Sequence, residues 1–538
     1  MHIVMIAAEN AALKGGKVGG IGDVIRDVPL ALARQGHQVS VITPGYQRLA
    51  HVNNSRRLGT INTVFCSQPQ ALDLYRLETG PDINPLVNHY VLDHPAFAAC
   101  GAGAIYCHDE SAPFATDAHK FALFCTAVCD WLIADELHKP DVIHLHDWHA
   151  SLITVLRRFH PRYQPLRSIR TVYTIHNLSL QGIRPLRDDY SSLEHWHPEL
   201  MTTDLWKKNP DINNIVDPRF KDCINLMRCG LLLSDTVHAV SPGYCEEIQR
   251  PNDVAKGFIG GEGLEQDLQL LAKKKRLVGI LNGCEYPATS AAGRVAGLRD
   301  NRKRRDLLQL ISDTILLWSG DRDWIPSSYL WAAHRVLQWQ LRRKPFPVSV
   351  VSIGRLTDQK VSLLRTGLKS ASNSECALDE ILRALGEGIY ILVGTGDHSY
   401  EQFFSGMMRK HKNFLYLQGF SEELAEALYG AADLFLMPSS FEPCGISQML
   451  AMRAGTPCVV HGVGGLKNTV FDGATGFVFD GDSIPAQLRN MLDSLDQASQ
   501  LVQHHPAQWQ LIQNNASEAR FLWDDAIVHY LKKLYAPS

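Results

Sequence analysis

The chain has 538 residues, with 53 Lys+Arg against 56 Asp+Glu and a formal net charge of −3 at pH 7. This balance excludes a strongly basic protein that wraps nucleic acid, and the length predicts more than one domain. We find no apolar run of the ~18 residues that a membrane helix needs and no signal-peptide pattern. We therefore expect a cytoplasmic protein with no nucleic-acid partner and no membrane partner.

The first 45 residues predict a strand, a glycine-rich loop, a helix and a second strand. The apolar residues 2–9 precede the glycine-rich residues 14–23, and a helical pattern over 24–36 precedes the β-branched residues 37–44. This order predicts a parallel sheet whose loop lies at the carboxyl end of the first strand, where open α/β sheets bind ligands. Further short apolar strands are predicted at Asp141–Leu145, Thr171–Ile175, Thr236–Val240 and Leu277–Leu281.

A second alternating series begins near residue 347 and predicts a second α/β unit. Its apolar segments lie at 347–356, 389–397, 413–420, 433–440 and 456–462, with helical patterns between them. Two α/β units are the economical interpretation. We place the boundary between them near Asn282–Pro287.

The cysteines predict neither a disulfide scaffold nor a metal site. The 12 cysteines contain no C-x-x-C pair, and they are too few for a disulfide-rich fold. Cys125 and Cys129 lie in an apolar helical stretch, where buried thiols behave as small hydrophobic groups. No tetrahedral zinc spacing is present, and we expect no metal and no cofactor.

The glycine-rich loop runs from Lys17 to Asp23 with the sequence KVGGIGD. It matches neither G-x-G-x-x-G nor a P-loop, so dinucleotide binding and nucleotide hydrolysis lose their usual support. Glycine amides at a helix start, together with the Lys17 ammonium, suit an anion. The alternative is a tight turn that needs glycine for its backbone geometry alone.

Two predicted strands of the first half end in polar side chains. His144 and His146 share one face of a strand that runs into Asp147. A metal site is one interpretation, but contacts to a hydroxylated substrate are favoured because no second histidine-rich segment supplies the remaining ligands. The next strand delivers His176 and Asn177, and a lone histidine there would usually be a satisfied core residue.

The second half supplies charged groups at strand ends. Arg355 and Lys360 lie five residues apart where a strand runs into a helix. A planar guanidinium and a point-charge ammonium at a helix start could hold a diphosphate. Glu442 precedes a proline and a helix start, which fixes its carboxylate near amides that would also receive phosphate.

Seven motifs together resemble one family, the bacterial glycogen synthases and plant starch synthases, the retaining glucosyltransferases of family 5. In chain order they are KVGGIGDV, HLHDWHA, YTIHNL, VSPGY, LNG, GRLTDQK and FEPCG. The resemblance implies an α/β fold with two Rossmann-like domains facing a cleft, the glycosyltransferase-B type. The implied domains are residues 1–284 on the acceptor side, 285–520 for the nucleotide sugar, and a C-terminal helix over 521–538 that crosses back to the first domain.

The resemblance also implies a reaction. Glucose would pass from ADP-glucose, with UDP-glucose left open, to the 4-hydroxyl at the non-reducing end of an α-1,4-glucan with retention of configuration. A glucan-binding protein that has lost turnover is the alternative, motivated by two departures from the family pattern, Val18 for threonine and Ser440 for arginine. A glycosidase would need two facing carboxylates, and only Glu442 has an organised context. A phosphorylase would need a pyridoxal lysine, for which no motif is seen.

Site residues follow from the same resemblance. Arg355 and Lys360 would hold the diphosphate. Main-chain amides would support them, around Gly19, Gly20, Gly464 and Gly465. Lys17 and Asp23 would lie in the substrate-binding loop, with Lys17 close to the reacting groups. His176 would bind the donor sugar, while Glu442, Cys444 and Gly445 would hold sugar hydroxyls. Asp147 and Asn177 would line the acceptor and donor sides, Asn282 would lie near the hinge, and Phe420 would pack on the nucleotide base.

Overall fold

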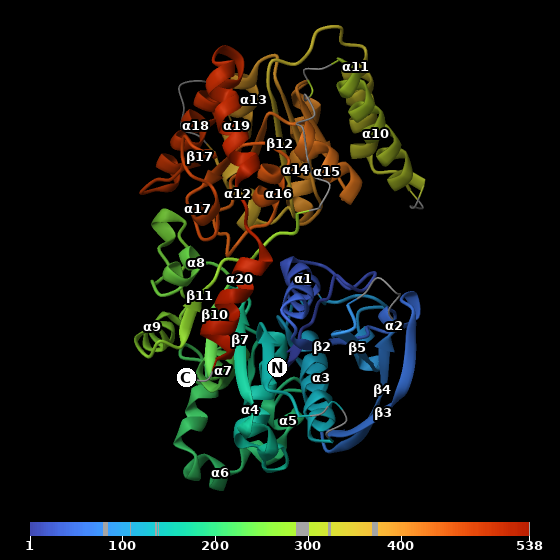
Figure 1. Cartoon of the computed structure of the whole chain (residues 1–538), viewed down its shortest axis with the longest axis vertical. Coiled ribbons are helices and arrows are strands. Elements are labelled where there is room, and N and C mark those ends of the chain that lie inside the picture. Colours follow the sequence, from blue (N-terminus) through green and yellow to red (C-terminus); the bar gives the residue numbers. More distant parts are fainter. Residues whose placement is uncertain are drawn as a thin grey trace. The chain divides into compact units, whose positions relative to one another are not determined.

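The computed structural model describes residues 1–78, 84–107, 109–134, 137, 139–286, 298, 301–320, 324–367 and 375–536. The chain forms two compact units (Figure 1). The first unit comprises Met1–Pro251, Gly260–Gly283 and Trp523–Ser538, and the second comprises Asn252–Ile259 and Cys284–Leu522. The C-terminal segment therefore folds with the first unit.

A nine-stranded sheet organises the first unit, in the order β11-β10-β7-β6-β1-β2-β5-β4-β3. All neighbouring strands from β11 to β5 are parallel, whereas β3 and β4 form an antiparallel hairpin at one edge. The strands are β1 (His2–Ile6), β2 (Gln38–Pro44), β3 (Ser55–Phe65), β4 (Gln68–Leu77), β5 (Val87–Asp93), β6 (Val142–His146), β7 (Arg170–Ile175), β10 (Thr236–Ala239) and β11 (Leu277–Gly279). A separate pair contains β8 (Ile183–Pro185) and β9 (Cys223–Asn225).

Helices flank this sheet (Figure 1). They are α1 (Gly20–Arg34), α2 (Leu49–Val52), α3 (Ala115–Ile133), α4 (Leu152–Phe159), α5 (Leu193–Trp196), α6 (Thr203–Lys208), α7 (Leu226–Leu233), α8 (Pro242–Glu247), α9 (Glu265–Lys273), α20 (Trp523–His529) and the π-helix η7 (Tyr530–Tyr535). A disulfide bond joins Cys100 to Cys107, and both Cys125 and Cys129 are buried thiols.

The C-terminal segment completes the core of the first unit. Trp523, Ile527 and Tyr530 are buried in one apolar cluster with residues of β1 and α1. Polar contacts reinforce the packing: the Trp523 indole N–H donates to Asp27 at 3.2 Å, and Arg170 Nε donates to the Leu534 carbonyl at 2.8 Å. The segment is thus an integral layer of the first unit.

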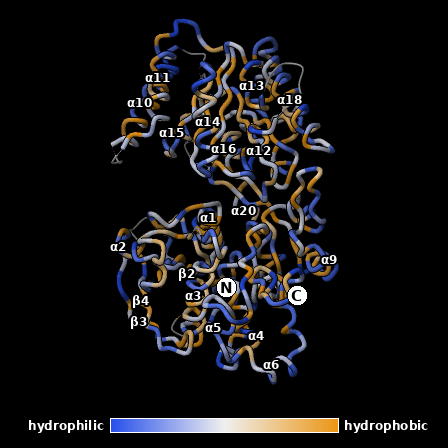
Figure 2. The backbone as a smooth tube through the Cα atoms, turned by 180° about the vertical axis from the view of Figure 1, so that it is seen from behind, coloured by the Kyte–Doolittle hydropathy of each residue, from blue (hydrophilic) through white to orange (hydrophobic). Residues whose placement is uncertain are grey.

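A six-stranded, wholly parallel sheet organises the second unit, in the order β14-β13-β12-β15-β16-β17. Its strands are β12 (Ser349–Ile353), β13 (Ile389–Val393), β14 (Phe414–Leu417), β15 (Leu434–Met437), β16 (Cys458–His461) and β17 (Gly476–Phe479). Its helices are α10 (Asn301–Gly320), α11 (Ser327–Gln340), α12 (Asp358–Arg365), α13 (Ala377–Leu385), α14 (His398–Lys410), α15 (Glu422–Ala431), α16 (Ser447–Arg453), α17 (Leu466–Thr469), α18 (Ile484–His504) and α19 (Pro506–Glu518). Along α10 and α11, hydrophilic and hydrophobic residues alternate (Figure 2), and one face of each helix joins the core.

The structure confirms the predicted α/β class and the predicted strands. Observed β6 is shifted by one residue from its predicted range, and β7 begins one residue earlier than predicted. The agreement is close because central parallel strands are continuous apolar runs that stand out in a sequence. The sequence reasoning did not anticipate the antiparallel edge formed by β3 and β4. Among the described residues, no helix is both long enough and apolar enough to cross a bilayer.

Candidate functional site

Several of the candidate residues lie where the strand order reverses in each sheet. In the first unit β1 lies between β2 and β6, so the loop after β1 and the residue after β6, Asp147, share one switch point. In the second unit β12 lies between β13 and β15, which brings Arg355 and Glu442 to the equivalent position. Ligands of open α/β sheets bind at such points, outside the carboxyl ends of the strands.

A buried carboxylate holds the glycine-rich loop of the first unit. Glu9 Oε2 accepts hydrogen bonds from the Val18 N–H at 2.8 Å and the Gly19 N–H at 2.6 Å, and Glu9 Oε1 accepts one from the Tyr106 hydroxyl at 2.7 Å. The Gly19 amide is therefore engaged within the protein, and α1 begins at the next residue, Gly20. The loop is held through its main chain, so its path does not depend on the exposed Val18 side chain.

Lys17 pairs with Asp23 inside the same loop. The Lys17 Nζ–Asp23 Oδ1 distance is 2.7 Å, and Arg26 also approaches this oxygen, at 3.5 Å. The Lys17 side chain is 39 % exposed, and ion pairs this exposed contribute roughly 0–1 kcal/mol. Lys17 can therefore exchange Asp23 for an anionic ligand at little energetic cost.

Asp147 connects the ends of β6 and β7. Its backbone is left-handed, with φ of 55°, and its buried Oδ1 accepts the His176 N–H at 2.7 Å and the Asn177 N–H at 3.5 Å. Burial raises the pKa of Asp147 to about 8, against the smaller opposing effect of these two hydrogen bonds. The side chain thus fixes the backbone that carries His176 and Asn177.

His176 is a neutral hydrogen-bonding group at this strand end. It shares a 3.0 Å hydrogen bond with His146 through Nε2, and burial lowers the pKa of His176 to about 3. His146 Nε2, His149 Nδ1 and Asn282 Oδ1 are buried polar atoms with no hydrogen-bond partner in the described part of the chain. The strand ends of the first unit therefore present uncharged donors and acceptors.

A directed chain of hydrogen bonds lies beneath these groups. His238 Nε2 donates to the Ile280 carbonyl at 3.2 Å, which leaves Nδ1 to accept from Thr174 Oγ1 at 3.0 Å. Thr174 in turn accepts from His144 Nε2 at 2.7 Å, so His144 Nδ1 accepts the Tyr535 hydroxyl at 2.8 Å. Burial lowers the pKa of His238 to about 4 and that of His144 well below its usual value, and both rings are neutral in this arrangement.

An ion pair joins the two central strand ends of the second unit. Lys360, on α12, pairs with Glu442 Oε2, which also accepts the Ser439 hydroxyl at 3.2 Å. The Glu442 side chain is 6 % exposed. The exposed Arg355 side chain has no ion pair or hydrogen bond to another described residue, so its guanidinium is available to a ligand.

Glycines allow close backbone packing next to Glu442. Gly445 has φ of +75°, and a Cβ there would lie 2.4 Å from Gln448 Oε1. A Cβ on Gly465 would lie 2.3 Å from the Cys444 carbonyl oxygen, and the Gly465 N–H donates to the Glu442 carbonyl at 3.0 Å. Gly464 is also left-handed, with φ of +47°. These positions require glycine because any side chain would collide or be strained.

Two predicted site residues follow strands at the sheet edges. Asn282 follows the edge strand β11, and Phe420, 58 % exposed, follows the edge strand β14. Sequence reasoning missed Glu9 and Tyr106. Glu9 lies shortly after β1, which ends at Ile6, and this is a usable signal, but no local pattern marks its contact with Tyr106.

Comparisons with known proteins match both units of the chain. Residues 2–270 match the starch synthase catalytic domain, and residues 351–497 match glycosyl transferases group 1. The glycogen synthase of Streptococcus equi subsp. equi is 32 % identical over 99 % of this chain and 98 % of its own length. That of Photobacterium profundum is 29 % identical over 98 % and 94 %.

A solved structure extends the likeness to the fold. The catalytic domain of starch synthase IV from Arabidopsis thaliana, bound to ADP and acarbose, superposes with a TM-score of 0.74 at 25 % identity, covering 99 % of this chain and 98 % of that domain. These matches span both sheets and every motif described above. The chain therefore belongs to the glycogen and starch synthase family, and is a glycosyltransferase with two Rossmann-like domains of the glycosyltransferase-B type.

Proposed function

We propose that this glycosyltransferase transfers glucose from ADP-glucose to the non-reducing end of an α-1,4-glucan with retention of configuration. The observation that carries the proposal is the group formed by Arg355, Lys360 and Glu442 at the switch point of the second sheet. Fixed cations that receive a departing diphosphate stabilise the charge that develops in the transition state. We assign the second unit to the nucleotide sugar and the first unit to the acceptor.

The second unit offers two cations in different states. Arg355 has an available guanidinium, whereas Lys360 is held in place by Glu442. In the proposed complex the Arg355 fork binds diphosphate oxygens, and Lys360 exchanges or shares its carboxylate partner with the same ligand. Glu442, with the main chain at Cys444 and Gly445, would then hold sugar hydroxyls. The backbone around Gly464 and Gly465 would supply further amide donors.

The polar groups of the first unit are better suited to hydrogen bonding with a sugar than to proton transfer. A histidine whose pKa is lowered to about 3 is neutral at pH 7, so His176 would serve as a hydrogen-bond partner of the donor sugar rather than as an acid. An imidazole with so low a pKa is also a weak proton acceptor, so the leaving phosphate would be the base for the incoming hydroxyl proton. Attack from the same face then gives retention. Lys17, Asp147 and Asn177 would position the reacting groups.

A donor assay tests the proposal. The protein is incubated with glycogen and either ADP-glucose or UDP-glucose, and release of nucleoside diphosphate and chain elongation are measured. We expect turnover with ADP-glucose and losses of at least about 100-fold in Lys360→Ala and Glu442→Ala, the scale for removing a preorganised electrostatic group. Lys412→Ala is the matched control. Lys412 is exposed and lies before the amino end of β14, whereas the proposed site residues follow the carboxyl ends of their strands.

The outcomes separate the alternatives. Turnover with UDP-glucose alone would overturn the choice of donor while leaving the transfer reaction in place. Glycogen binding without turnover on either donor would instead support a glucan-binding protein on the same scaffold. Equal losses of transfer activity in Lys360→Ala and Lys412→Ala would contradict the role proposed for Lys360.

A further inference from the structure

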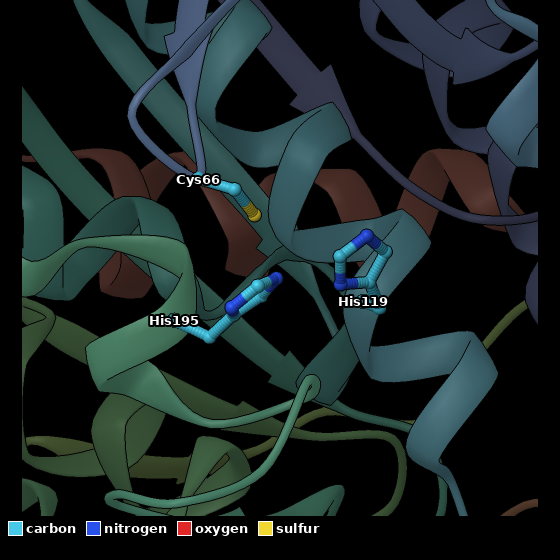
Figure 3. Close-up of side chains that lie close together, drawn as sticks. All are labelled: Cys66, His119 and His195. Carbon is cyan, nitrogen blue, oxygen red and sulfur yellow. The ribbon is translucent and has the colours of Figure 1, made fainter.

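Three potential metal ligands converge at the edge of the first unit, away from the switch point. Cys66, His119 and His195 lie far apart in the sequence, on the turn between β3 and β4, on α3 and on α5. Their side chains come together in Figure 3. One ligand atom from each lies within 4.8 Å of the other two.

We infer that Cys66, His119 and His195 form a binding site for a divalent zinc ion, with a fourth position open to a water molecule. One thiolate and two imidazoles are a donor set typical of zinc, and hard cations such as Mg²⁺ and Ca²⁺ prefer oxygen ligands. Zinc bonds of ~2.3 Å to sulfur and ~2.0 Å to nitrogen draw ligand atoms to within about 3.5 Å of one another. Side-chain adjustments of about an ångström therefore close the site.

The tautomer of His119 suits this role. His119 Nδ1 lies 3.1 Å from the Tyr190 carbonyl oxygen, and because a carbonyl only accepts, Nδ1 carries the proton. His119 Nε2 is then left with its lone pair. Metal-binding histidines commonly donate their other ring N–H to a backbone carbonyl, which fixes the ring and raises its basicity.

The position of Cys66 is equally specific. Cys66 and Ser67 form a two-residue hairpin turn with φ of 53° and 57°, a conformation that favours asparagine and glycine. The Cys66 N–H donates to the Trp196 carbonyl at 3.2 Å, which ties the turn to the residue after His195. A cysteine in this conformation is a departure from turn preferences, and it places a free thiol beside two imidazoles.

A neighbouring group provides a contrast. His160, His197 and Glu199 also bring three potential ligand atoms within 4.8 Å of one another. However, Glu199 Oε1 already binds His160 Nε2 at 2.8 Å and His197 Nδ1 at 3.0 Å. Its candidate ligand atoms are thus used in a hydrogen-bonded network. Cys66 Sγ and His119 Nε2 have no such partner among the described residues.

Zinc at this site would link the edge hairpin of the sheet to two neighbouring helices. The β3–β4 hairpin is the end of the nine-stranded sheet, and its turn would be joined to α3 and α5 through a single ion. Because only the folded chain brings the three ligands together, bound zinc stabilises the folded state by mass action. The inferred effect is on the stability of the folded chain and is separate from glucose transfer.

The test uses the full-length protein, stripped with a chelator and reloaded with Zn²⁺. Bound zinc per chain is measured after equilibrium dialysis, and Co²⁺ is added in parallel to detect a thiolate-to-metal charge-transfer band. We expect one zinc per chain and an affinity at least about 100-fold lower in Cys66→Ser, His119→Gln and His195→Ala, since even partners of metal ligands cost 10–100-fold. The Co²⁺ thiolate band should vanish in Cys66→Ser.

Controls separate this site from its neighbours. Cys223→Ser removes another half-buried free cysteine of the same unit, and His160→Gln removes a member of the adjacent network; both should keep wild-type zinc affinity. Because His195 is exposed, His195→Ala remains informative even where a Cys66 variant fails to fold. Wild-type affinity in His195→Ala, loss confined to His160→Gln, or the absence of stoichiometric zinc in the wild-type protein would each overturn the inference.

Discussion

The two units place different polar groups at the carboxyl ends of their central strands. The first unit presents buried neutral histidines, including His146 and His176, with pKa values lowered by burial. The second presents the Lys360–Glu442 ion pair and the available Arg355 guanidinium. One parallel-sheet architecture thus supports either uncharged hydrogen bonding or charge binding, depending on the side chains that follow each strand.

The difference has a physical origin. Groups enclosed on all sides by a sheet and its helices lose solvation, which favours the neutral form of histidine. Lys360 keeps partial exposure and a carboxylate partner, which together allow the charge to persist. The comparison predicts that the stability of the first unit depends on pH. It also predicts that transfer activity depends on the charged side chains of the second unit.

Acidification should produce the largest effect, and it should act on the first unit. Burial lowers the pKa of His89 and His238 to about 4 and that of His149 and His176 to about 3. Between these values and about 6.5 the unfolded chain binds more protons, so stability falls as pH decreases. At pH 5 each such histidine lowers the free energy of unfolding by about 2 kcal/mol. Asp147, with a raised pKa, opposes this trend but is outnumbered.

Hydrogen exchange of the whole chain measures this response. Between pH 7.5 and pH 5, after correction for intrinsic exchange rates, amides of β6, β7 and β10 should lose protection before those of β12 and β13. Simultaneous loss in both sheets would contradict the contrast between the two units.

Removal of the Arg355 guanidinium should give the next largest effect, a loss of transfer activity that originates in the second unit. We expect Arg355→Ala to lower kcat/KM by about 100-fold, equivalent to about 2.7 kcal/mol. Arg355→Lys should recover only part of the rate, because an ammonium lacks the bidentate fork. Steady-state kinetics with the nucleotide sugar varied is the measurement. Full activity in Arg355→Ala would remove this residue from the site.

A smaller effect is expected at the carboxylate that holds the glycine loop. Glu9→Gln replaces one acceptor oxygen by an amide group and loses a charge-assisted hydrogen bond, worth about 1.5–3 kcal/mol. We expect kcat to fall about tenfold or more as Val18 and Gly19 lose their fixed position. Tyr106→Phe is the companion variant, since it removes the hydroxyl hydrogen bond to Glu9 Oε1 and leaves the loop amides bound to Glu9 Oε2. Equal kinetics in Glu9→Gln and the wild-type protein would show that the loop keeps its position without this carboxylate.

The smallest effect is expected at the C-terminus. Tyr535→Phe leaves His144 Nδ1 without its donor, which should lower the free energy of unfolding by about 1–2 kcal/mol. Because Tyr535 lies at the far end of the hydrogen-bond chain from Ile280, transfer activity should remain unchanged. Chemical denaturation and the donor assay together check both parts, and a large loss of activity at unchanged stability would refute them.

The central strands could be predicted from the sequence, but the edge hairpin could not. β12 and β13 are buried at every position, so they form apolar runs that are visible without a structure. In β3, the buried side chains are confined to Ile61, Thr63 and Phe65, which leaves a mainly polar segment. The sequence motifs indicated the family, which the comparisons confirmed.

The contacts within the candidate site required coordinates. Lys17 and Asp23 are close in sequence, and their pairing could be expected from the loop alone. The hydrogen bond between Glu9 and Tyr106 joins segments with no shared pattern. The direction of the histidine chain depends on the Ile280 carbonyl, a main-chain group that no residue type specifies. The roles proposed for individual site residues stay predictions until the variants are measured.

The placement of α20 in the first unit also bears on how the protein is made. Trp523, Ile527 and Tyr530 belong to the same apolar cluster as strand β1, yet the ribosome synthesises them after the whole second unit. During translation, N-terminal domains generally fold first, but here the N-terminal unit lacks part of its interior until residues 523–530 emerge. The unit that starts the chain is therefore completed only after the second unit has been synthesised.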